Sequence, residues 1–473
     1  VESPPADSGD TGSQGSHKRK TCPGGPLRKV SRRKHAKDSS GSVYEALFLR
    51  GEESDVRILA LGEEWNLHRV YLCQSGYFAS MFSGAWRETT MDTIELQMPD
   101  ENIDREALHE ALGSLYRDSM LIPPGRVVAI LATASMLQLD ELIQQCGEVM
   151  KETVSAQTVC SYYYSAESYG LQNIRSMCLQ WLLDNMMTQC SEELLREVRL
   201  DLMKEVIASS DLLVMEVEMD VYTMLKKWMF LQLQPTWRGP HSALLPDTDS
   251  WLARSRSESG GTPFLETEQG RAFMPVFHQL RLAYIIWPLT SARLIHQDAL
   301  IPASWLTPVY KEYWLAPNRD EQTRKLRPMD VYVSDLQGNS MRCGGQLHRD
   351  KQCSWRWEGF NFSWDLVVCY ANQHIILRCN ALNESCSLGV SLLWQRNVAF
   401  RLRLSSLDRA GRAVSRKDTG YQMLSLRKDQ ELQVVNLENQ DVVFPIYVSC
   451  NFLFLHRQGR CPEVGPLQKS SEN

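Results

Sequence analysis

The chain has 473 residues, of which 43% are hydrophobic and 23% charged, and its formal net charge is −6. This composition is typical of a folded chain of two or three domains, and it excludes a largely disordered protein or one that coats nucleic acid with a dense excess of Lys and Arg. The 13 cysteines include no Cys-x-x-Cys pair. We therefore expect free thiols in a reducing compartment, with no metal site and no other cofactor.

Residues 1–41 are rich in Ser, Gly, Pro and charge, with almost no large apolar side chain. Such a segment cannot offset the entropy of ordering, so we expect a disordered basic tail. Two clusters of cations have the spacing of a bipartite nuclear localisation signal, which favours a nuclear protein. They are Lys18, Arg19 and Lys20, then Arg32, Arg33 and Lys34. A solvated charge run and a weak contact to nucleic acid are the alternatives.

Residues 42–151 predict a compact α/β domain. Asp55 to Leu61 alternates like a strand, Trp65 to Leu72 leads a second strand into a helix, and Thr93 to Met98 gives a third strand. Helical spacing follows. The expected helices cover Leu108 to Tyr116, Arg126 to Met136 and Leu139 to Met150.

Within this domain, "SDVRILALGEEWNLHRVYLCQSGYFASMF" (residues 54–82) resembles a BTB/POZ domain. BTB domains that bind the cullin-3 scaffold carry an apolar-x-Glu triplet after the Met-Phe-x-Gly turn, so the resemblance implies a cullin contact at Trp86, Arg87 and Glu88. An exposed indole can bury about 150–250 Å² against a partner. The alternative is that Trp86 packs on its own domain and Glu88 is ordinary surface.

BTB domains also commonly form homodimers through the helix that precedes the first strand. The resemblance therefore places Ala46, Leu47 and Leu49 in a dimer interface. The same side chains could instead cap the core of their own domain, and the sequence leaves both possibilities open.

Residues 152–320 show helical periodicity without strands. Apolar stripes such as Ile174, Cys178 and Trp181 indicate a helical core. The stretch from Thr236 to about Gly270 is rich in Pro, Gly, Ser and charge and predicts a long loop. "TVCSYYYSAESYGLQNIRSMCLQWLLDNM" (residues 158–186) resembles the BACK region that follows BTB in ubiquitin-ligase adaptors.

Residues 321–458 change to a period of two. Phe400, Leu402 and Leu404 alternate with polar residues, which is typical of a half-buried strand. Other short strands are expected at Leu366 to Tyr370, Ile375 to Arg378, Val390 to Trp394 and Val442 to Val448. The pattern predicts an all-β, sandwich-like domain, and residues 459–473 predict a second disordered tail. The whole chain is thus expected to be a multi-domain α+β protein.

The β domain carries the most specific resemblance. "GNSMRCGGQL", "WRWEGFNFSWDLVVCY" and "AFRLRLSS" resemble the carboxy-terminal domain of the germ cell-less family, and no kelch repeat occurs. By analogy with other adaptors, client choice should lie in this domain. Its candidate contacts are Trp355, Trp357, Phe360, Phe362 and Trp364. The alternative is that these aromatic side chains belong to the core, where strand aromatics are more often found.

The family resemblance implies a nuclear or nuclear-envelope-associated substrate adaptor of a cullin-3 ligase, with a role in germ-cell development and spermatogenesis. It also implies lamina-associated polypeptide and the DP partner of cell-cycle transcription factors as binding partners, and it leaves the client open. No catalytic motif is present, so we expect no enzyme activity. The apolar run Val442 to Leu455 contains Pro445 and Asn451 and is too short for membrane insertion. The alternative function is a nuclear-envelope scaffold or transcriptional co-repressor that uses BTB only for dimerisation.

Overall fold

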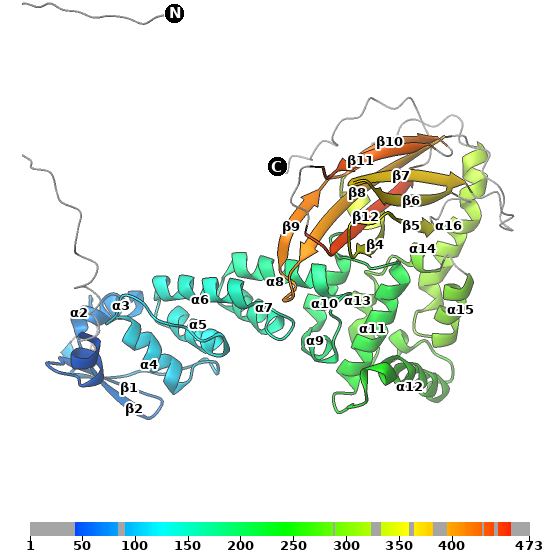
Figure 1. Cartoon of the computed structure of the whole chain (residues 1–473). Helices are drawn as coiled ribbons and strands as arrows, with labels where there is room; N and C mark the ends of the chain where they lie inside the picture. Colours follow the sequence, from blue (N-terminus) through cyan, green and yellow to red (C-terminus); the bar gives the residue numbers. More distant parts are fainter. Residues whose placement is uncertain are drawn as a thin grey trace, which may run out of the picture. The chain divides into compact units, whose positions relative to one another are not determined.

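The computed structural model describes residues 43–83, 90–286, 289–322, 333–358, 364–381, 395–427, 430–438 and 443–455. Figure 1 colours the chain along its sequence, from blue to red. The chain divides into two compact units. The first unit contains the residues up to Gln74, Phe78–Gln97 and Leu112–Met120. The second unit contains Ser75–Tyr77, Met98–Ala111 and the chain from Leu121 onward.

The first unit is built on a three-stranded sheet of β1 (Val56–Ala60), β2 (Glu63–Leu67) and β3 (Thr93–Glu95). β1 lies in the middle, antiparallel to β2 and parallel to β3. The alternation in β1 buries Val56, Ile58 and Ala60, as its sequence predicts. Leu61 and Gly62 both have positive φ, which is the backbone that a tight two-residue hairpin requires.

Short helices precede and follow the strands of this sheet, and a long run of helices follows them in the chain. The helices up to residue 208 are η1 (Tyr44–Leu49), α2 (Arg69–Leu72), α3 (Gly76–Phe82), α4 (Arg105–Ser114), α5 (Val127–Met136), α6 (Asp140–Thr153), α7 (Val159–Ser168), α8 (Gln172–Asn185), α9 (Glu192–Glu197) and α10 (Leu200–Ala208). The later ones are α11 (Glu218–Leu233), α12 (Leu244–Glu258), α13 (Met274–Phe277), α14 (Leu282–Ile285), α15 (Leu289–Asp298), α16 (Ala303–Gln322) and α17 (Val333–Asn339).

Helix α12 contradicts the long loop expected between Thr236 and Gly270. Its fifteen residues bury Leu244, Thr248 and Leu252, which recur every fourth residue on one face. Trp251 adds edge-on ring contacts to Phe230 and Phe264, at centroid distances of 5.8 and 5.0 Å. The loop prediction was wrong because it relied on the Pro- and Ser-rich composition and overlooked this short apolar stripe. Pro246 lies in the first turn of α12, where proline does not interrupt a helix.

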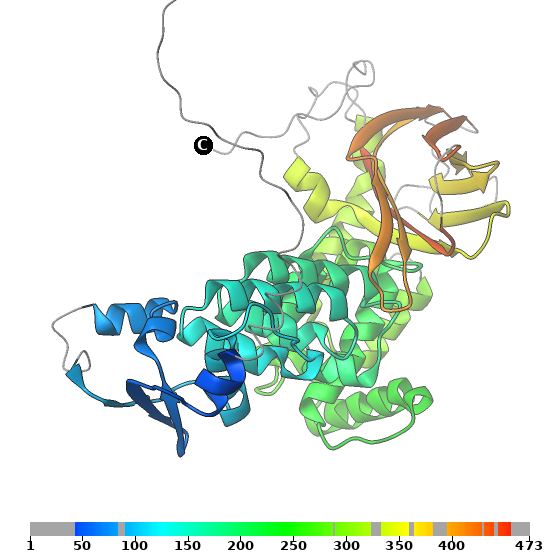
Figure 2. The same cartoon turned by 60° about the vertical axis from the view of Figure 1, so that its left-hand side comes forward.

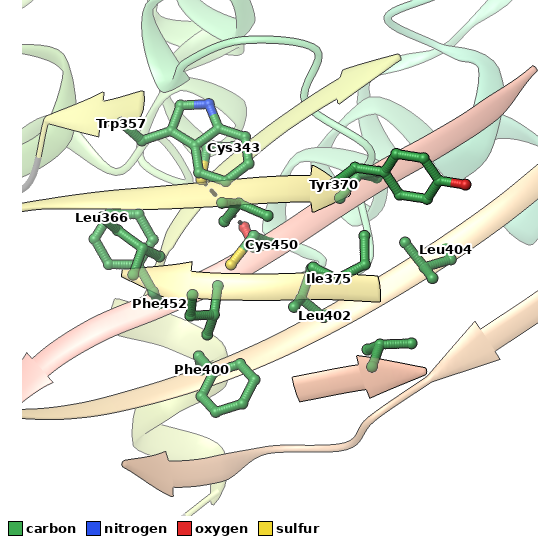
Figure 3. Packing of buried hydrophobic residues seen from close by; sticks show 14 of the residues in the cluster. Cys343, Trp357, Leu366, Tyr370, Ile375, Phe400, Leu402, Leu404, Cys450 and Phe452 are labelled. Carbon is green, nitrogen blue, oxygen red and sulfur yellow. Dashed lines mark hydrogen bonds between the residues drawn. The ribbon is translucent and has the colours of Figure 1, made fainter. Parts of the chain in front are cut away.

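The carboxy-terminal strands form two antiparallel sheets, in agreement with the expected all-β domain. One sheet has the order β10 (Gln422–Arg427), β8 (Gln395–Leu407), β12 (Ile446–Leu455), β4 (Met341–Leu347), and β9 (Ala413–Asp418) also pairs with β8. The other has the order β11 (Glu431–Asn436), β7 (His374–Ala381), β6 (Trp364–Ala371), β5 (Cys353–Glu358). Phe400, Leu402 and Phe452 from the first sheet share one core with Leu366 and Tyr370 from the second (Figure 3).

The strand predicted from Val442 begins only at Ile446 and continues to Leu455. Pro445 precedes it and has no N–H to donate to a ladder, which accounts for the later start. The strand predicted at Val390 to Trp394 lies outside the described residues.

Candidate functional site

Most of the predicted binding residues lie outside the part of the chain that the structure describes. These are the six cations of the tail, the cullin triplet Trp86, Arg87 and Glu88, and the two phenylalanines Phe360 and Phe362. Trp364 begins β6, and its side chain is likewise outside the description. Their roles stay predictions. The structure does describe residues near them in the chain, among them Arg69, helix η1 and strand β5.

Arg69 joins the two chain segments that flank the cullin triplet. Its guanidinium lies over the Phe82 ring, 4.7 Å from the centroid, and donates a 2.6 Å hydrogen bond to the Met91 carbonyl. Its backbone N–H donates to Asp55 Oδ1 at 2.8 Å. One side chain thus contacts both Phe82 and Met91, and the neighbouring Val70 is 74% exposed. Arg69 lies in the stretch that resembles a BTB/POZ domain, and its sequence position alone did not indicate this role.

His68, beside Arg69, has a structural environment. It is buried, its Nε2 lies 2.8 Å from the Glu52 carbonyl, and its Nδ1 lies 3.2 Å from the Tyr116 hydroxyl. The Tyr116 hydroxyl also accepts the His68 N–H at 3.0 Å. Burial raises the pKa of Tyr116 well above its usual range, so the phenol stays neutral and keeps this arrangement.

The predicted dimer helix η1 has an inner side and an outer side. Phe48 is buried and its ring contacts Tyr44 and Tyr116, with centroid distances of 5.1 and 5.3 Å. Gly113 permits this approach, because an added Cβ would lie 2.9 Å from the Phe48 ring. Leu49 is 54% exposed, and the other two predicted interface residues are half-buried. Phe48 therefore fixes η1 on its own unit while Leu49 remains available to a partner, an arrangement that the sequence could have indicated through the Tyr44–Phe48 spacing.

The tryptophans of β5 face the core between the two sheets, and the prediction of a client contact was wrong for Trp357. Trp357 is 4% exposed and belongs to the core shared by the two sheets (Figure 3). Trp355 is half-buried and packs against the same core, with its ring parallel to that of Trp357 at 6.5 Å. Two residues apart on a strand, both side chains point to the same face, and here that face is the inner one.

In the carboxy-terminal sheet β10–β8–β12–β4, the face turned away from the shared core forms a buried ion pair with the helical region. Arg342 of β4 is 1% exposed, and its Nε and Nη2 donate to the carboxylate of Glu218, at 2.8 and 2.9 Å. The Glu218 side chain is fully buried at the start of α11. Arg342 Nη1 also donates to the carbonyls of Ile207 and Ser209, at 2.7 and 2.8 Å, which satisfies the end of α10. A single cation thus joins β4 to two helices.

Neighbouring polar residues extend this contact. Arg403 Nη1 donates to the Asp211 carbonyl at 2.8 Å, and Asn451 Nδ2 donates to the Ser210 carbonyl at 3.0 Å. Arg401 Nη1 lies 2.5 Å from Asp211 Oδ1. Burial lowers the pKa of Arg403, although the attraction of Asp211 opposes this. The β domain is therefore fixed to the loop between α10 and α11 through a hydrogen-bonded, largely buried polar surface.

Among the described residues, no group of three or more His, Cys, Asp or Glu side chains is placed to hold a metal ion. None of the helices described has the length and apolar character needed to span a bilayer. The nine cysteines whose side chains are described are free thiols.

Comparison with known proteins agrees with the order of domains along the chain. Residues 44–154 match the BTB/POZ domain family, and residues 159–242 match the family described as BTB And C-terminal Kelch (BACK). The chain is 56% identical to mouse (Mus musculus) Germ cell-less protein-like 1 over 434 residues, which is 92% of this chain and 83% of that relative. It is 55% identical to the human (Homo sapiens) protein of that name over 429 residues, covering 91% and 83%. Protein germ cell-less of Drosophila melanogaster is 32% identical over 455 residues, covering 91% and 79%. The chain therefore belongs to the germ cell-less family of BTB–BACK proteins.

Proposed function

We propose that this chain is a substrate-recruiting adaptor of a cullin-3 ubiquitin ligase, nuclear and active in germ-cell development and spermatogenesis. The pairing of BTB with BACK supports the proposal, because proteins with both domains generally bind cullin-3 and dimerise. The observation that carries it is therefore the succession of a BTB and a BACK domain along the chain. The buried Glu218–Arg342 ion pair adds that the β domain is fixed to the helical region, as an adaptor requires of a client-binding domain.

The adaptor contributes position and performs no bond chemistry. A client held on the β domain would present its lysines at a high effective concentration to the conjugating enzyme that carries ubiquitin. The choice of client would then depend on binding alone. In this proposal Trp86 and Glu88 contact the scaffold, and Arg69 contacts Phe82 and Met91 on either side of them in the chain. Lamina-associated polypeptide and the DP partner of cell-cycle transcription factors are the partners that we propose from the family resemblance.

Pull-down of cullin-3 with the double variant Trp86→Ala, Glu88→Lys tests the proposal. The first unit offers a matched control. Leu61, Gly62 and Glu63 form a second apolar-x-Glu triplet at the β1–β2 hairpin, and its residues are exposed. We expect the first variant to lose cullin-3, and Leu61→Ala with Glu63→Lys to retain it. Retention by both variants would favour the scaffold or co-repressor function, in which BTB serves only for dimerisation.

A further inference from the structure

Strand β9 is an edge strand with one side open. Within the described part of the chain it pairs only with β8, and all of its residues are exposed except Lys417, which is half-buried. Val414, an apolar residue, is 57% exposed. The Thr419 N–H bonds the Leu402 carbonyl at 3.0 Å, and alternation along the strand then directs the N–H of Arg416 away from β8. The strand therefore offers backbone groups to a further strand.

This exposed strand is held in place by its hairpin tip. The Ala410 carbonyl accepts a 2.9 Å hydrogen bond from Trp181 Nε1, and the Gly411 carbonyl accepts one of 2.8 Å from Asn185 Nδ2, both from α8. Gly411 has a φ of +78°, and a side chain there would collide with Asn185. Figure 2 shows this hairpin, in orange, extending to the helices. Because the tip is anchored, the edge is already ordered before a partner arrives, which lowers the entropic cost of binding.

The charges on the hairpin select the kind of partner. Four cations, Arg409, Arg412, Arg416 and Lys417, lie in the eleven residues 408–418, which contain two acids. The acids are Asp408 and Asp418. Two copies of β9 placed side by side would bring like charges together, and such charges are a common protection of sheet edges against self-association. An acidic strand would instead be attracted.

We propose that β9 is a docking edge that accepts an extended acidic segment of another protein as an additional strand. Main-chain hydrogen bonds would supply affinity. Selectivity would come from pairing of the acidic side chains with Arg409 and Lys417, because Arg412 and Arg416 already pair with Asp408 and Asp184. If the chain is an adaptor, as proposed above, the protein that docks on β9 is its client, and only this identification rests on the adaptor proposal. Binding of a strand to β9 itself requires no cullin.

A fluorescein-labelled peptide of alternating Val and Glu, nine residues long, tests the proposal on the full chain. We expect fluorescence anisotropy to show binding at least ten times tighter than that of the matching Val–Lys peptide. The same Val–Glu peptide N-methylated at alternate residues should also bind at least ten times more weakly, because it cannot complete the ladder. Hydrogen exchange of Ala413–Asp418 should slow when the unmodified peptide is bound.

Charge reversal locates the site. Arg409→Glu with Lys417→Glu should weaken Val–Glu binding at least tenfold, whereas Arg349→Glu with Lys351→Glu, an equal change at the exposed β4–β5 turn, should leave it within twofold. Equal weakening by both variants, or no protection of β9, would overturn the proposal. Protection of β9 that grows with protein concentration in the absence of peptide would also overturn it, because a second copy would then occupy the edge. Loss of cullin-3 binding would leave these results unchanged, so the two proposals can fail separately.

Discussion

Replacement of Arg342 by alanine should strongly destabilise the second unit. The change leaves the Glu218 carboxylate buried without its bidentate partner, and the nearest remaining cation atom, Arg281 Nε, lies 3.9 Å from Glu218 Oε1. The carbonyls of Ile207 and Ser209 also lose a donor. Removal of one member of a buried ion pair costs about 3–5 kcal/mol. The second unit has more than 300 residues, and the entropy of unfolding is about 2.1 cal/mol/K per residue, so about 1 kcal/mol shifts its Tm by about 1.5 °C. We therefore expect Tm to fall by at least about 4 °C.

Thermal unfolding followed by tryptophan fluorescence measures this effect. Arg378→Ala is the matched control, because Arg378 and Glu431 form a 3.3 Å ion pair in the same domain whose side chains are 39% and 58% exposed. An exposed pair contributes at most about 1 kcal/mol, so this variant should stay close to the wild type. Arg342→Met with Glu218→Met should recover part of the lost stability, because no unpaired charge remains buried. A Tm for Arg342→Ala no lower than that of Arg378→Ala would refute the reasoning.

Three further predictions concern other parts of the chain. Hydrogen bonds from Arg126 lower the pKa of Asp104 from 3.8 to about 2, so the stability that this carboxylate contributes is present above about pH 4 and lost toward about pH 2. The Tm values of wild type and Asp104→Asn should converge over that interval, and a constant difference would contradict the assignment. Leu49→Asp should reduce self-association in sedimentation experiments, and an unchanged mass would exclude Leu49 from the dimer interface. Deletion of residues 18–34 should move a tagged protein toward the cytoplasm under the microscope, whereas unaltered nuclear location would reject the import signal.

The strands β6, β7 and β8 were predicted at nearly their observed positions. In β8, Phe400, Leu402 and Leu404 enter the shared core as expected. The opposite face was expected to be polar, and its arginines have more specific roles than solvation. Arg401 and Arg403 contact Asp211 and the Ser210 carbonyl, about 190 residues earlier in the chain. A period of two identifies the buried face of a strand and contains no information about what covers the other face.

Sequence alone determined the order of the α/β, helical and β domains, because hydrophobic periodicity and the BTB and BACK motifs are local patterns of neighbouring residues. It could not determine that Trp357 fills the core or that α12 replaces a loop. Nor could it pair Glu218 with Arg342, which are 124 positions apart. Those outcomes depend on which surfaces meet after the elements form, since a buried charge or ring is stable only where distant residues supply its partners and exclude water.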